Sequence, residues 1–153
     1  MRPTGLEHGA FIIAFGAVLR KAAGERDAAR VVSRVGFWLD DDVLLAPDLS
    51  LVPHELIPSE HERRRMSSGG PRLAVEMAYP DRDAGLLAEK VDLYLAAGVD
   101  PVLVIDPVRR LIAVHSPGQP VRLLREGDTL DGGGAIPGFA MTVADISDLV
   151  DLV

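Results

Sequence analysis

The chain has 153 residues, which is long enough for one domain with its own hydrophobic core, and we expect residues 1–153 to form a single domain. Hydrophobic residues make up 48% and charged residues 25%, so extended disorder is excluded, and the absence of cysteine excludes disulfides and thiolate metal sites. The net charge of −7 argues against broad nucleic-acid binding, but it is compatible with a local basic groove or with an acidic site neutralised by metal.

The first predicted element is a helix over residues 8–23, where apolar side chains occur almost all round and Gly24 can end the run. Its segment 10–19, AFIIAFGAVL, has the length of a signal-peptide apolar region, but charged residues flank it and no good cleavage site follows. It is also shorter than the ~20 apolar residues that span a bilayer. We therefore expect a buried helix in a cytoplasmic protein that does not associate with membranes.

Strands and loops are predicted next. Even spacing of apolar side chains over residues 29–39 predicts one or two strands, and residues 43–52, VLLAPDLSLV, predict a strand broken at Pro47. Residues 54–71 are the most polar stretch and predict a loop. The three arginines at 63–65 in this loop either contact phosphate or form a solvated surface.

The second half of the chain is predicted to contain further strands and two helices. Residues 72–79 predict a strand, residues 83–97 a helix stopped at Gly98, and residues 101–107, PVLVIDP, a central strand buried on both faces. A hairpin over residues 111–126 and a short final helix complete the chain. This order predicts an α/β fold with a mixed sheet and helices on its faces.

Three ionisable side chains lie in otherwise apolar predicted elements: Asp48, Glu76 and Lys90. A carboxylate inside a strand is rare unless paired, and a natural partner for Glu76 is a second strand carboxylate with a divalent cation between them. Oxygen ligands suit Mg²⁺ or Mn²⁺. Lys90 shares a helix side with Tyr94, from which its ammonium can reach the carboxylates and offset charge on a phosphate. The residues alone also allow a plain buried Glu76–Lys90 ion pair, with Asp48 starting a turn.

The order Pro47-Asp48 and then Glu76 on the following strand resembles the motif of the restriction-endonuclease-like superfamily, which is Pro-Asp, a spacer, and Asp/Glu-x-Lys. Several segments more closely resemble the Uma-type family of bacterial endonucleases, long filed as a domain of unknown function. These segments are EHGAFIIAFGAVL, PDLSLVP, LAVEMAYPDRDAGLLAEKVDLYLAAGVDPVLVIDPVRRLIAVH and IPGFAMTVADI. The resemblance extends from about residue 7 to 146 and is most specific over residues 73–107.

The resemblance implies a restriction-endonuclease-like core, a central mixed sheet flanked by helices, with Asp48 and Glu76 as metal ligands. The superfamily places a lysine two residues after the second acid, where this chain has Ala78. The Uma-type family instead carries a lysine on the following helix, which corresponds to Lys90. Lys90 must then reach the site from another element.

The first predicted helix supplies two further candidates for the site, Glu7 and His8. A carboxylate or histidine on this helix can complete such a site. Both residues are equally explained as helix-start residues, where the helix dipole favours Glu7.

Two functions follow from the residues and the resemblance together. The first is a nuclease that cleaves phosphodiester bonds by Mg²⁺- or Mn²⁺-activated water, with Asp48, Glu76 and the backbone carbonyl of Met77 as ligands and Lys90 stabilising charge. The alternative is a non-catalytic dimeric scaffold or regulatory module with a vestigial or structural acidic pair. The resemblance also predicts a homodimer, to which the late strands in residues 111–126 would contribute an edge or face. Hydrolysis of another phosphoester has no separate signature in the sequence.

Overall fold

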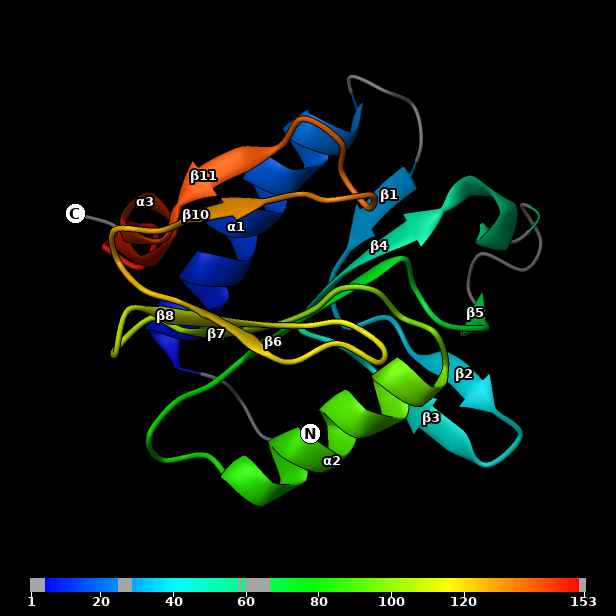
Figure 1. Ribbon diagram of the computed structural model, residues 1–153. Helices are drawn as coiled ribbons and strands as arrows, with labels where there is room; N and C mark the ends of the chain where they lie inside the picture. The colour runs from blue at the N-terminus through cyan, green and yellow to red at the C-terminus, as the bar shows by residue number, and fades with distance from the viewer. Residues whose placement is uncertain (1–4, 25–28, 58, 60–66, 152–153) are drawn as a thin grey trace.

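The computed structural model describes residues 5–24, 29–57, 59 and 67–151. In these residues a mixed sheet carries α1 and α3 on one face and α2 on the other (Figure 1). The helices are α1 (Leu6–Gly24), α2 (Ala84–Ala96), α3 (Val143–Asp148) and the short 3-10 helix η1 (His54–Leu56). None of the helices in the described part of the chain is long and apolar enough to cross a membrane.

The main sheet has the strand order β1-β4-β6-β7-β8-β9. Its strands are β1 (Ala29–Val32), β4 (Leu49–Pro53), β6 (Leu73–Met77), β7 (Val102–Asp106), β8 (Leu111–His115) and β9 (Arg122–Leu124). Only β6 and β7 are parallel among these neighbours, and α2 provides the crossover that a parallel pair needs. The predicted α/β class with a mixed sheet is confirmed.

Two small sheets extend the fold. Their strands are β2 (Phe37–Asp40), β3 (Val43–Leu45) and β5 (Ser67–Ser68) in one sheet, and β10 (Thr129–Asp131) and β11 (Ala140–Thr142) in the other. The prediction of a plain loop over residues 54–71 is wrong at both described ends, because they form η1 and β5, and β5 pairs in parallel with β2. The arginines at 63–65 lie outside the described residues.

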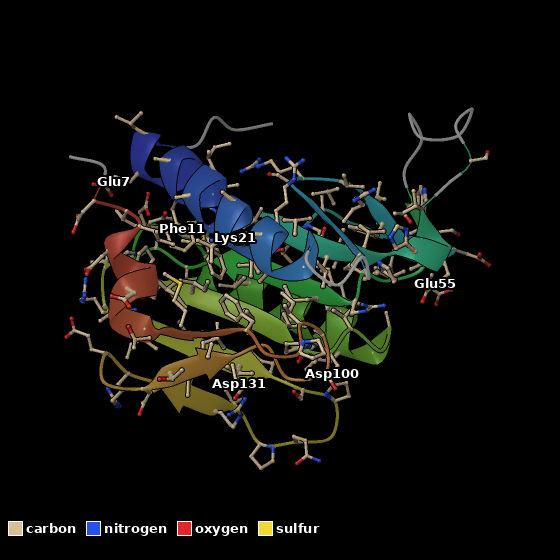
Figure 2. All side chains as sticks on the ribbon, turned by 90° about the horizontal axis from the view of Figure 1, so that it is seen from above. Glu7, Phe11, Lys21, Glu55, Asp100 and Asp131 are labelled. Carbon is tan, nitrogen blue, oxygen red and sulfur yellow. The ribbon has the colours of Figure 1, made fainter. Side chains whose placement is uncertain are left out.

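The hydrophobic core has two parts, one on each face of the sheet. The larger part packs α1 and α3 against the sheet, and Phe11 points from α1 toward the strands (Figure 2). A Cβ at Gly16 would meet the Leu49 side chain at 3.3 Å, so α1 lies close against β4. The smaller part packs Val91 and Tyr94 of α2 against the opposite face. The close packing of both helices fixes the elements that border the candidate site.

Candidate functional site

Asp48 and Glu76 are brought together by strand register. Leu49 of β4 pairs with Val75 of the antiparallel β6 and Ser50 pairs with Ala74, so the same register sets Asp48 opposite Glu76. Directly opposed residues of antiparallel strands share a face, with Cβ atoms about 5 Å apart. Asp48 is 5% exposed and Glu76 is 3% exposed.

Both carboxylates line one groove of about 670 Å³, which we call the carboxylate groove. It lies where β4 and β6 meet the first turns of α2. Its charged lining residues are Arg34, Asp48, Glu76, Asp81, Arg82, Asp83 and Lys90. The groove therefore brings the acids and several cations together at one accessible place.

Asp48 accepts contacts from three separate parts of the chain. Its Oδ2 accepts a 2.9 Å hydrogen bond from the Met77 backbone N–H. Its Oδ1 lies 3.2 Å from Nε2 of His8 and 3.5 Å from a guanidinium nitrogen of Arg34. These donors compensate the cost of burying a carboxylate at the end of the sheet.

The turn after β1 holds this aspartate and aims Arg34 at it. The Ser33 hydroxyl donates a 2.9 Å hydrogen bond to the backbone carbonyl of Asp48, and the Arg34 N–H donates a 3.1 Å bond to the carbonyl of Pro47. Arg34 has φ of 54°, in the left-handed region that non-glycine residues seldom adopt. Such a conformation persists only where the surroundings fix it, and here two hydrogen bonds do so.

Glu76 is held by two side chains of α2. Its Oε1 accepts a 2.9 Å hydrogen bond from the Tyr94 hydroxyl and lies 2.7 Å from the Lys90 ammonium. Lys90 and Tyr94 are one helical turn apart, as their spacing predicts. Burial raises the pKa of Glu76, although the Lys90 charge opposes this shift. Burial also raises the pKa of Tyr94, so its hydroxyl stays a hydrogen-bond donor.

His8 links the start of α1 to the groove. A guanidinium nitrogen of Arg82 lies 3.3 Å from its Nδ1, and because guanidinium can only donate, Nδ1 is the acceptor. We infer that the ring proton is on Nε2, which lies 3.2 Å from Oδ1 of Asp48. Burial lowers the pKa of His8, which favours this neutral ring.

The predicted site residues converge with one exception. Asp48, Glu76, Met77 and Lys90 line the groove, and His8 contacts Asp48. Met77 contacts Asp48 through its N–H, and its carbonyl stays a predicted ligand. Glu7 is exposed, and Figure 2 places it at the outer end of α1.

Sequence reasoning missed Arg34 and Arg82. Arg34 reaches the site only through the backbone conformation of its turn, which no local pattern signals. Arg82 had one available signal, because it lies in the turn directly before the helix that carries Lys90.

The donor set fits a small divalent cation. Among the described residues, no group of three or more His, Asp or Glu side chains could hold a metal ion. Mg²⁺ needs no such group, because it usually keeps several waters and binds through one or two carboxylates plus substrate phosphates. Within the described residues, the hydrogen bond and the ion pair of Glu76 are both made by Oε1, so its Oε2 is available as a ligand.

Comparisons with known proteins bear on this site. A family model described as "Uma2: Putative restriction endonuclease" matches residues 1–144. A crystal structure of "a putative nuclease belonging to DUF820" from Anabaena variabilis ATCC 29413 matches with a TM-score of 0.84 and 18% identity, covering 98% of this chain and 84% of that chain. A cryo-EM structure of a DrdV–DNA complex matches with a TM-score of 0.43 and 16% identity, covering 92% of this chain and 11% of that chain. No curated protein matches. The first structural match shows that this chain has the same fold as that DUF820 protein.

Proposed function

The chain belongs to the Uma2 family, and on this basis we propose that it is a nuclease whose active site is the carboxylate groove. The observation that carries the proposal is the placement of Asp48 opposite Glu76, with Lys90 beside them at the same groove. Family membership and the nuclease-like fold support the class of reaction. The register and the groove support the choice of residues.

The residues that would hold a divalent cation, Mg²⁺ or Mn²⁺, are Asp48, Glu76 and the backbone carbonyl of Met77. A bound ion of this kind polarises a phosphate oxygen and lowers the pKa of water. The carboxylates supply the hard oxygen ligands that such ions prefer. Two carboxylates leave other ligand positions to water and substrate, so we expect modest affinity in the absence of substrate.

The chain itself supplies the positioning and the positive charge. Tyr94 and Lys90 both contact Oε1 of Glu76, which leaves Oε2 free to face the groove. The Lys90 side chain is 27% exposed, so its ammonium is accessible to a substrate phosphate as well as to Glu76. Charge that develops on a phosphate in the transition state is stabilised by such a preorganised cation.

Nucleic acid is the substrate class that the family description favours, although the chain carries a net charge of −7. The groove offsets this charge locally, because Arg34, Arg82 and Lys90 all line it. Phosphate contacts of this kind dominate nucleic-acid affinity. We therefore propose a polynucleotide phosphodiester as the substrate.

One observation favours the second candidate, a non-catalytic scaffold. The 2.7 Å contact between the half-buried Lys90 and the buried Glu76 is an ion pair of the kind that a structural role needs. Breaking such a pair by removing one partner is strongly destabilising. However, the pair borders an open groove, and Asp48 lies at the same place, which a purely structural pair does not require.

A nuclease assay separates the two candidates. We expect the protein to cleave single- or double-stranded DNA or RNA with Mg²⁺ or Mn²⁺ and to lose cleavage when EDTA is added. Asp48→Asn and Glu76→Gln should each abolish cleavage. Asp106→Asn, which changes another buried carboxylate outside the groove, should leave it unchanged. Absence of cleavage on all four substrates in folded wild-type protein would favour the scaffold.

A further inference from the structure

Arg82 has partners that are unusual for an arginine in a groove lined by carboxylates. Its guanidinium contacts Nδ1 of His8 at 3.3 Å and lies 5.3 Å from the centre of the Tyr79 ring. Both partners are neutral when the His8 proton is on Nε2. Within the residues that the structure describes, Arg82 makes no ion pair with a carboxylate, whereas Arg34 faces Asp48 and Lys90 faces Glu76.

The acids on either side of Arg82 do not neutralise it directly. The Asp83 carboxylate caps α2 by accepting hydrogen bonds from the Gly85 and Leu86 N–H groups at 2.9 and 3.1 Å. Asp81 is exposed and lines the groove, so it opposes an incoming anion at long range. Arg82 is itself exposed, and its guanidinium can therefore turn from His8 and Tyr79 toward the groove.

We propose that Arg82 binds a substrate phosphodiester in the carboxylate groove, next to the phosphate that Asp48, Glu76 and Lys90 act upon. The proposal rests on the proposed function for the identity of the substrate. A guanidinium presents a planar fork of donors that matches two phosphate oxygens. His8 and Tyr79 do not offer it such a pair of oxygen acceptors. An arginine whose contacts are neutral gains most from such an anion, because no ion pair has to be broken first.

The proposal is tested by binding without cleavage. Fluorescence anisotropy of labelled single- and double-stranded oligonucleotides should be measured in EDTA and again in Ca²⁺, over a range of salt concentrations. Arg82→Gln should weaken binding by roughly three- to tenfold and should reduce the slope of log K against log salt by about 1. Arg82→Lys should recover part of the affinity, since it keeps the charge and loses the fork.

Matched variants control for net charge. Arg122→Gln removes one positive charge from the exposed edge strand β9, outside the groove, and should leave both affinity and salt slope unchanged. Asp81→Asn removes a negative charge beside Arg82 and should strengthen binding. Thermal unfolding of each variant checks that the fold is retained.

The outcomes separate this inference from the proposed function. Arg82→Gln that binds like the wild type, or no more weakly than Arg122→Gln, would overturn the role of Arg82. If wild-type protein binds inorganic phosphate in an Arg82-dependent way but binds no oligonucleotide, the phosphate site stands and the nuclease proposal fails. Wild-type protein that binds neither inorganic phosphate nor an oligonucleotide would overturn the inference.

Discussion

Glu76 is the ionisable side chain on which the account depends most, because it is buried and yet is expected to be charged when it functions. Lys90 and Tyr94 both contact one of its oxygens, and burial still raises its pKa. A carboxylate kept in such surroundings lowers stability, which is a common cost of a functional site.

This shift predicts a pH dependence of stability with a definite sign. Because the pKa of Glu76 is higher in the folded state than its ordinary value of 4.5, the folded protein binds more protons than the unfolded chain above that pH. Its contribution to the free energy of unfolding is therefore present below pH 4.5 and is lost as pH rises through the folded pKa. The free energy of unfolding of the wild type and of Glu76→Gln should be measured by urea denaturation from below pH 4.5 to about pH 7. Over this range the wild-type value should fall relative to that of the variant. A stability difference that stays constant over this range would show that Glu76 is not perturbed.

Replacing Lys90 tests its role in cleavage. Lys90→Met should lower any metal-dependent cleavage about a hundredfold, since loss of one transition-state charge partner costs ~3 kcal/mol. Metal binding should be largely retained, because the ligand oxygens remain. Lys21→Met, which removes an exposed lysine at the end of α1, is the matched control and should leave cleavage unchanged. Undiminished activity of Lys90→Met would refute the role, and a chain that no longer folds would identify Lys90 as a structural partner of Glu76.

Among the elements, those with strong local signals were predictable from sequence. The helix expected over residues 83–97 is observed as Ala84–Ala96, and the strand expected over 101–107 as Val102–Asp106. The sheet of β2, β3 and β5 was not predicted, because β5 has two residues and pairs with a strand far away in sequence. The β10–β11 hairpin was likewise missed.

In the site too, local sequence patterns identified residues, whereas their arrangement depends on contacts between distant segments. The pattern of polar residues in apolar elements identified Asp48, Glu76 and Lys90 as candidates. Their arrangement depends on the β4–β6 register, and Arg34 joins them through its left-handed backbone conformation. Neither property is encoded within one short segment. The sequence could therefore name the acids and suggest the Glu76–Lys90 contact, but it could not predict the contacts that Arg34 and His8 make with Asp48.

The start of α2 is stabilised by a side-chain cap. The Asp83 side chain caps the helix by accepting bonds from two N–H groups of its first turn. Asp83→Ala should therefore lower stability by about 1 kcal/mol and the melting temperature by about 2–4 °C. Asp81→Ala, an exposed neighbour that caps no helix, should change the melting temperature by less, as measured by circular dichroism. Equal effects of the two substitutions would contradict the capping role.

For the whole molecule, the homodimer stays a prediction. Val121 and Leu123 are 54% and 48% exposed at the β9 edge, where a second chain could cover them. Sedimentation should give twice the chain mass of 16.4 kDa, and Leu123→Lys should shift the mass toward that of one chain. Ile13→Lys, at an exposed apolar position on α1, should remain dimeric. A wild-type mass that equals one chain at every concentration would refute the dimer.

We propose that Asp48 and Glu76 act as a pair that binds one divalent cation in the carboxylate groove. Calorimetric titration with Mn²⁺ tests it most directly, because it measures binding without relying on a substrate. We expect weak binding of one ion by the wild-type protein, and we expect Asp48→Asn and Glu76→Gln each to weaken it while Asp106→Asn does not. Equal Mn²⁺ binding by the wild type and both groove variants, or no binding by folded wild-type protein, would contradict the account.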